Sequence, residues 1–261
     1  MFFLLLTLSI FSGLLLGSCL NILANNLPIY LHAVWQPSSS TEKISASTFL
    51  LRPLFCSHCQ QPYLPTQHSA TLNYLLLKTR CTICKTSFGF RGLTLELLCG
   101  GLALVIPQYF GWNERSLIYW LFSSVLLLLA CIDYYHYLLP DCLTLPLLWL
   151  GLLVNTFGLM TQSKDAIWGA CIGYGMLWGT AKIFKFLRHQ EGMGQGDMKL
   201  LATLGAWLGS SSLLFILLTA SSLGAFVGLV NLLRKKSTAT TLLPFGPFLA
   251  IAGVLALFCG N

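Results

Sequence analysis

Charged residues are scarce in this chain of 261 residues. Asp, Glu, Lys and Arg make up 9% of it, hydrophobic residues make up 56%, and the mean hydropathy is +0.74. Soluble domains carry about 25% charged residues, so the composition excludes an ordinary globular protein. None of the four charged residue types precedes Glu42, and the chain opens on a long apolar run. The composition therefore predicts a membrane protein.

Several common catalytic signatures are absent as well. The sequence has no Walker A loop, no Gly-x-Ser-x-Gly elbow, no His-Glu-x-x-His pair and no dinucleotide-binding fingerprint. No internal repeat stands out, whereas a transporter built from inverted repeats should show paired interruptions in its two halves. Any chemistry must therefore rest on other residues.

A membrane-spanning helix takes roughly 20 apolar residues, and the sequence offers about eight candidate runs. They lie near residues 2–24, 93–111, 116–133, 139–160, 165–186, 198–209, 212–233 and 242–259, of which the sixth is short. All Lys and Arg residues except Arg115 and Lys164 fall on one side, which the positive-inside rule makes the cytoplasmic side. We expect an all-α polytopic membrane protein with about eight transmembrane helices. The net charge of +7 then reflects topology and contact with anionic lipid rather than a nucleic-acid partner.

The first run contains Leu16-Gly17-Ser18-Cys19, which resembles a lipoprotein cleavage site. A signal peptide should begin with basic residues and lose its apolar character near the cut. Here no basic residue precedes the site, and Ile22-Leu23-Ala24 continue the apolar run. We expect residues 1–27 to form a retained first transmembrane helix.

The main polar segment, residues 28–92, carries two Cys-x-x-Cys pairs. The pairs are Cys56 with Cys59 and Cys81 with Cys84. This arrangement suits tetrahedral zinc, with each pair forming a small knuckle. The positive charge of the segment places it in the cytosol, where thiols stay reduced. We predict a small cytoplasmic loop with a structural zinc ion, followed by a membrane core over residues 93–261; a redox pair or metal-free thiols are the alternatives.

Two carboxylates lie at the ends of separate apolar runs. Asp133 closes the run at 116–133, and Asp197 directly precedes the run at 198–209. Ionisable groups at such depths are costly and indicate function by default. Gly194 and Gly196 precede Asp197, and glycine lets a backbone or a substrate approach closely. Two adjacent carboxylates can share a proton and activate a water molecule, so the sequence predicts an acid–base pair.

Two further features lie close to helix ends. Asp141, in Leu138-Leu139-Pro140-Asp141, precedes a long apolar run. We expect its carboxylate to cap that helix by accepting from free backbone N–H groups, with a direct catalytic role as the alternative. Pro244-Phe245-Gly246-Pro247 must interrupt a helix. This break either lines a cavity with backbone or forms an interfacial loop.

Taken together and in this order, these motifs resemble those of the bacterial type IV prepilin peptidases, intramembrane aspartic proteases of the GxGD class. The resemblance extends over nearly the whole chain. It is carried by Gly17-Ser18-Cys19-Leu20-Asn21, the two Cys-x-x-Cys pairs, Glu96-Leu97-Leu98, Ile132-Asp133 through Asp141, Leu143-Thr144-Leu145-Pro146, Glu191 through Leu201, and Pro244 through Pro247. By this resemblance Asp133 and Asp197 are the catalytic residues, with Gly194, Gly196 and Asp141 in support.

The resemblance implies an enzyme of the bacterial inner membrane. Its substrates are type IV prepilins and type II secretion pseudopilins, whose basic leader is cut at the cytoplasmic face. The implied second activity is methylation of the new amino terminus with S-adenosylmethionine. Two departures concern this methylation: Asn26-Leu27-Pro28 replaces the usual Arg-Leu-Pro, and Gln67 to Ala70 replaces a Glu-Asn-Ile-Pro stretch.

Two readings from other classes compete with the peptidase. A proton- or cation-coupled transporter would use Asp133 and Asp197 as a relay. A non-enzymatic scaffold would dock a secretion partner through the zinc loop. The Gly-x-Gly-Asp context, with both carboxylates on the cytoplasmic side, favours the peptidase over the transporter. The intact aspartates disfavour the scaffold.

Overall fold

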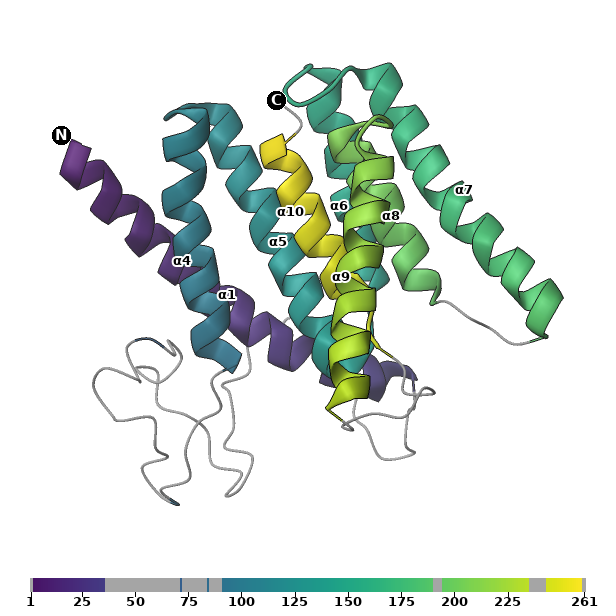
Figure 1. The fold of residues 1–261 in the computed structure, drawn as a ribbon. Helices are drawn as coiled ribbons and strands as arrows, with labels where there is room; N and C mark the ends of the chain where they lie inside the picture. Colours follow the sequence, from purple (N-terminus) through teal and green to yellow (C-terminus); the bar gives the residue numbers. More distant parts are fainter. Residues whose placement is uncertain are drawn as a thin grey trace. The chain divides into compact units, whose positions relative to one another are not determined.

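A computed structural model of the chain describes residues 2–35, 71, 84, 91–189, 194–234 and 243–259 (Figure 1). These residues form eight helices and short connections. The helices are α1 (Phe2–Trp35), α4 (Arg91–Phe110), α5 (Glu114–His136), α6 (Asp141–Thr156), α7 (Ser163–Arg188), α8 (Gln195–Leu208), α9 (Leu213–Leu233) and α10 (Gly246–Cys259). Each predicted apolar run coincides with one of them, which confirms the all-helical class.

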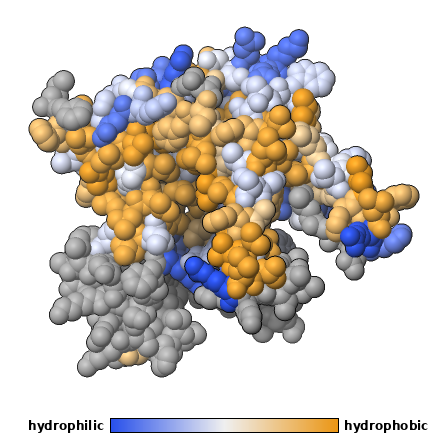
Figure 2. All heavy atoms as spheres, viewed as in Figure 1, coloured by the Kyte–Doolittle hydropathy of each residue, from blue (hydrophilic) through white to orange (hydrophobic). Residues whose placement is uncertain are grey.

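Four of these helices are long and apolar enough to cross a membrane. They are α1 over Leu5–Trp35, α4, α5 and α9, while α6 and α10 are shorter apolar helices. Large apolar side chains are exposed on them, such as Leu218 at 63% and Phe226 at 66%. Figure 2 shows apolar side chains over much of the visible face. The chain is therefore a membrane protein of several spans, and the count of about eight crossings remains a prediction.

Helix α1 is longer than predicted from the sequence. The expected run ended at residue 24 and the polar loop was placed from residue 28, but the helix continues to Trp35 with Pro28 inside it. Leu27 is buried, and the residues that follow Pro28 are again mostly apolar. Proline is tolerated in membrane helices because neighbouring groups satisfy the backbone that it leaves unpaired. Residues 28–35 therefore belong to the helix and not to the loop.

The chain forms two compact units, residues 1–131 and 132–261. In the first unit, α1 and α4 approach each other backbone to backbone. A Cβ atom built on Gly13 would lie 2.7 Å from the Cβ of Ala103, and one on Gly17 would lie 2.7 Å from the Cα of Glu96. No real side chain tolerates such distances, so these glycines make the close packing possible.

In the second unit, α8 is the central helix. It packs against α6, α7 and α10, and its residues from Leu200 to Trp207 are all buried. Gly169 and Gly205 place the backbones of α7 and α8 in contact, and a Cβ on Gly173 would lie 2.8 Å from the carbonyl oxygen of Leu201. Figure 1 shows α7 and α8 side by side. Gly169 and Gly173 therefore allow α7 and α8 to pack closely.

Candidate active site

Asp133 lies in the last turn of α5, in the second unit, and is only 6% exposed. Its Oδ2 accepts a hydrogen bond of 3.0 Å from the backbone N–H of Gly246, the first residue of α10. The first N–H groups of a helix have no partner within the helix, so one of them is free to bind this carboxylate. The break at Pro244-Phe245-Gly246-Pro247 therefore presents a backbone N–H to Asp133, while a cavity lined by this backbone stays a prediction.

Gly246 is a site residue that sequence reasoning did not single out. A Cβ atom at this position would lie 2.6 Å from Oδ2 of Asp133. Any side chain would push the carboxylate away or displace the start of α10. The available signal was a glycine between two prolines, which marks a place where backbone must come close to another group.

Asp197 lies in the first turn of α8, directly before the predicted span at 198–209. The helix begins after Gly194, which has extended backbone angles and no side-chain cap. Burial, and secondly the negative charge of Asp133, raise the pKa of Asp197 to about 7. The two carboxylates predicted as a pair therefore interact electrostatically. Near neutral pH such a pair holds a proton on one member while the other is ionised.

Gly194 and Gly196 differ in what they contact. A Cβ atom on Gly194 would be 3.6 Å from Oδ2 of Asp197, which is an ordinary contact. A Cβ atom on Gly196 would lie 2.7 Å from the Cβ of Leu139, in the segment between α5 and α6. Gly196 therefore lets the first turn of α8 pack on that segment. The sequence predicted close approach at these glycines, and at Gly196 the close neighbour is the chain itself.

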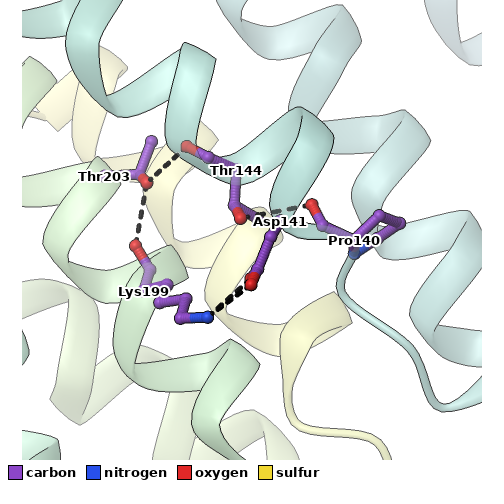
Figure 3. A network of polar contacts seen from close by, with 5 residues as sticks. All are labelled: Pro140, Asp141, Thr144, Lys199 and Thr203. Carbon is purple, nitrogen blue, oxygen red and sulfur yellow. Dashed lines mark hydrogen bonds and ion pairs between the residues drawn. The ribbon is translucent and has the colours of Figure 1, made fainter.

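The predicted helix cap at Asp141 is wrong. The N-cap position of α6 is Pro140, with φ −66° and ψ 127°, and the helix start has no side-chain cap. Asp141 is the first residue inside the helix, so its carboxylate is not placed to accept from the free backbone N–H groups. It accepts instead from the Lys199 ammonium, whose Nζ lies 2.7 Å from both Oδ1 and Oδ2 (Figure 3). The sequence could not show this partner, because it lies 58 residues away.

The connection that follows Asp133 bears several aromatic rings. The backbone N–H of Tyr137 donates to the carbonyl oxygen of Asp133 at 2.8 Å, and Tyr137 takes a φ of +52°. That left-handed conformation is uncommon for a bulky residue. Tyr134 and Tyr137 are exposed at 60% and 61%, and His136 is exposed as well. The chain thus leaves the carboxylate site through a turn that carries phenol rings at its surface.

A second polar cluster lies in the first unit and joins two of the motifs. The Glu96 side chain on α4 is fully buried. Its Oε1 accepts from the Ser18 hydroxyl of α1 at 2.9 Å, and its Oε2 accepts from the backbone N–H and the hydroxyl of Thr71 at 2.8 Å. Glu96 therefore ties Thr71, which lies between the two predicted cysteine pairs, to both helices.

Three of the four predicted zinc ligands, Cys56, Cys59 and Cys81, lie outside the described residues. Cys84 is described and is partly exposed. Within the described ranges, no group of three or more His, Cys, Asp or Glu side chains could hold a metal ion. The zinc site remains a prediction from the sequence.

Two family models match the chain. That of the type IV leader peptidase family matches residues 120–229, which contain both Asp133 and Asp197. That of the bacterial peptidase A24 N-terminal domain matches residues 11–110, which contain Glu96 and all four cysteines of the two pairs. The two matched segments are consecutive along the chain: the first contains the cysteine pairs and the second contains both aspartate motifs.

Curated relatives are similar over almost the entire chain. A protein of Stutzerimonas stutzeri is 41% identical over 95% of this chain and 89% of the relative. Proteins of Pseudomonas putida and of Pseudomonas aeruginosa are each 38% identical, over 98% and 97% of this chain and 91% and 90% of the relative. All three are named prepilin leader peptidase/N-methyltransferase. No solved structure matches the chain. At this identity and coverage, and with both family models matched, the chain belongs to the type IV leader peptidase family.

Proposed function

We propose that this chain cleaves the leader peptide of type IV prepilins with Asp133 and Asp197 as its two catalytic carboxylates, and that it then N-methylates the new amino terminus. The observation that carries the catalytic assignment is the environment of Asp197, where burial and secondly the negative charge of Asp133 raise its pKa to about 7. The names of relatives at 38–41% identity support both activities. Type II secretion pseudopilins are further substrates, and the site of action is the cytoplasmic face of the bacterial inner membrane.

The surroundings of the two carboxylates support an assignment of the general base and the general acid. The N–H of Gly246 donates to Asp133, and a hydrogen bond of this kind stabilises the ionised carboxylate. Asp197, with its raised pKa, holds the shared proton near neutral pH. In this proposal Asp133 is the general base, and Asp197 is the general acid.

The reaction needs no covalent intermediate. Asp133 takes a proton from a water molecule while the water oxygen attacks the scissile carbonyl carbon, and Asp197 donates its proton to the carbonyl oxygen. The resulting tetrahedral diol collapses when Asp133 returns its proton to the leaving amine and Asp197 recovers a proton from one hydroxyl. The substrate must unwind at the cut, since a helix keeps its carbonyl oxygens in hydrogen bonds.

Methylation follows at the amine that cleavage exposes. The neutral amine attacks the methyl carbon of S-adenosylmethionine, so that an N–C bond forms, an S–C bond breaks, and S-adenosylhomocysteine and a proton leave. An α-amino group has a pKa near 8, so a neutral fraction is available without a strong base. The segment matched by the N-terminal domain model is the natural place for this step, because the peptidase pair lies outside it.

The cysteine segment provides a structural zinc site in this proposal. Cys56, Cys59, Cys81 and Cys84 supply four thiolates, which complete a tetrahedral shell. Such a closed site stabilises the fold of the loop and offers the metal no open position for catalysis. Zinc therefore takes no part in the hydrolysis.

Cleavage of a purified prepilin in detergent tests the catalytic assignment. Asp133→Asn and Asp197→Asn keep the size of the side chain but cannot ionise, and each should lower the cleavage rate by about 10³-fold or more, since general acid–base catalysis contributes 10²–10⁴-fold. Asp165→Asn is the matched control, because Asp165 binds Ser210 and Thr161 elsewhere in the unit. A variant of either catalytic residue that cleaves near the parental rate is not part of the pair. A transporter that uses the two aspartates only as a relay would not cleave the prepilin at all.

A further inference from the structure

Asp141 and Lys199 form an ion pair between the first residue of α6 and the fifth residue of α8 (Figure 3). Lys199 is two residues from Asp197, and Asp141 is eight residues from Asp133. The ion pair thus connects the two aspartate motifs, and neither of its side chains takes part in the proposed reaction. We propose that the Asp141–Lys199 ion pair positions Asp197 for catalysis. This role rests on the proposed function of Asp197.

The ion pair is the first of several polar contacts between α6 and α8. One turn further along α8, the Thr203 hydroxyl donates to the carbonyl oxygen of Lys199 at 2.8 Å and lies 3.3 Å from that of Thr144. The Thr144 hydroxyl in turn donates to the carbonyl oxygen of Pro140 at 3.2 Å. Figure 3 shows that these groups connect the two helix starts.

The contacts continue at the same spacing toward the other end of the two helices. The Trp207 indole N–H donates to the carbonyl oxygen of Leu147 at 2.8 Å, and Gly151 leaves room for the ring. The amide of Asn155 donates to the carbonyl oxygen of Ala206 at 2.8 Å. Lys199, Thr203 and Trp207 are four residues apart and so share one face of α8. This face fixes the rotation and the axial register of α8 against α6.

The first turn of α8 depends on the ion pair more than the later turns do. The first N–H groups of a helix lack partners within the helix, and Gly194 provides no side-chain cap. Among the described residues, Gly196 in this turn packs on Leu139, and Lys199, which directly follows the turn, binds Asp141. The hydrogen bonds of Thr203 and Trp207 to α6 lie one and two turns later, at buried residues. Loss of the ion pair therefore loosens the turn that carries Asp197.

Because the ion pair is partly exposed to solvent, its loss should change the position of Asp197 more than the stability of the fold. The Lys199 side chain is 25% exposed and the Asp141 side chain is 56% exposed. Exposed ion pairs add little to folding free energy, because water screens them. Catalysis is more sensitive, since a displacement of about 1 Å costs on the order of 100-fold in rate. A positioning pair should thus change the rate of cleavage while stability changes little.

The test is a double-mutant cycle on the full chain with purified prepilin as substrate. The variants are Asp141→Asn, Lys199→Met and their combination, with Lys199→Arg as the conservative exchange and Asp165→Asn as the control. We measure kcat, KM and the thermal midpoint of each. Both single variants should lower kcat by about tenfold or more with KM within about twofold. The combination should be no worse than the worse single variant, and Lys199→Arg should keep most of the activity.

Asp165→Asn removes a comparable carboxylate network, so it should lower the thermal midpoint and leave kcat unchanged. The proposal is overturned if both single variants keep parental kcat, if their losses multiply in the combination, or if kcat falls only in step with the thermal midpoint. Should the single variants fail to fold, Asp141→Glu is measured instead and must lower kcat at parental stability, while Lys199→Arg keeps most of the activity. Asp197→Asn separates the two hypotheses: if it is active, the catalytic assignment fails, and if it is inactive while Asp141→Asn is fully active, only the positioning role fails.

Discussion

The backbone N–H of Gly246 donates to the carboxylate of Asp133 at 3.0 Å, across 113 residues of sequence. The contact brings the start of α10 to the end of α5 within the second unit. It also gives the helix break at Pro244-Phe245-Gly246-Pro247 a specific role, because the first N–H groups of a helix have no partner within the helix. One oxygen of Asp133 is held by backbone, so the position of α10 sets the orientation of that carboxylate.

Gly246→Ala should therefore lower kcat strongly. The added Cβ atom would lie 2.6 Å from Oδ2 of Asp133, so the carboxylate or the start of α10 must move. A movement of about 1 Å should reduce kcat on the order of 100-fold, measured as cleavage of purified prepilin. Gly175→Ala is the matched control, because nothing in the described part of the chain lies within 4 Å of a Cβ there. Equal rates for the two variants would show that the Gly246 contact does not orient Asp133.

The pH profile of cleavage reports the protonation of Asp197. The pKa of Asp197 is raised to about 7, and the proposed mechanism needs its protonated form. The protonated fraction is high below pH 7 and is lost as the pH rises through that value. Cleavage by the full chain should thus decline from about pH 7 upward, roughly tenfold per pH unit once the pH exceeds the pKa. Recovery of the rate on return to pH 6 is the control for irreversible loss.

A rate that stays constant or rises between pH 6 and 9 would contradict the assignment of Asp197 as the acid. The ionised form of Asp197 would then be the active one, and the two aspartates would exchange roles. The measurement must follow cleavage and not methylation, because the substrate amine itself titrates near pH 8.

The helices could be predicted from the sequence because apolar runs of this length have few other solutions in a membrane. The carboxylates could be found because charge is so scarce that each ionisable residue stands out. The end of α1 could not be predicted, because a proline such as Pro28 ends a helix in soluble proteins but is tolerated inside a membrane helix. For the same reason the predicted polar segment begins at residue 28, whereas the helix continues to Trp35.

The partners of Asp141 and Gly246 were beyond sequence reasoning for a different reason. A carboxylate just after a proline predicts a helix cap from local pattern alone. Whether it caps or binds a distant cation depends on where α8 lies, and Lys199 is 58 residues away. Likewise, the two prolines around Gly246 predicted a break, but not which side chain the freed backbone would meet. Contacts between distant segments decide both cases.

The cysteine spacing predicts about one zinc ion per chain. Metal analysis of purified protein should find it, and Ser substitutions at Cys56 or Cys81 should remove it. Because binding energy at such a site contributes directly to folding, these variants should show lower protein levels or faster proteolysis of the loop. Cys171→Ser is the control, since Cys171 is exposed on α7 and lies far from the two pairs in sequence. Purified protein that contains no zinc would contradict the prediction of a zinc site.

Methylation is the last prediction, and it separates the two activities. After cleavage in the presence of S-adenosylmethionine, mass spectrometry should find the mature pilin about 14 Da heavier at its amino terminus than the peptidase product alone. Asp197→Asn should abolish both changes when prepilin is supplied, because no amine is exposed. Supplied instead with pre-cleaved, unmethylated pilin, the same variant should still add the methyl group, since the family model that contains Asp133 and Asp197 does not extend into residues 11–110. A parental enzyme that cleaves fully but never adds the methyl group would be a peptidase alone. The loss would then point to Asn26 and to the segment from Gln67 to Ala70, where the sequence departs from the family pattern while both aspartate motifs are intact.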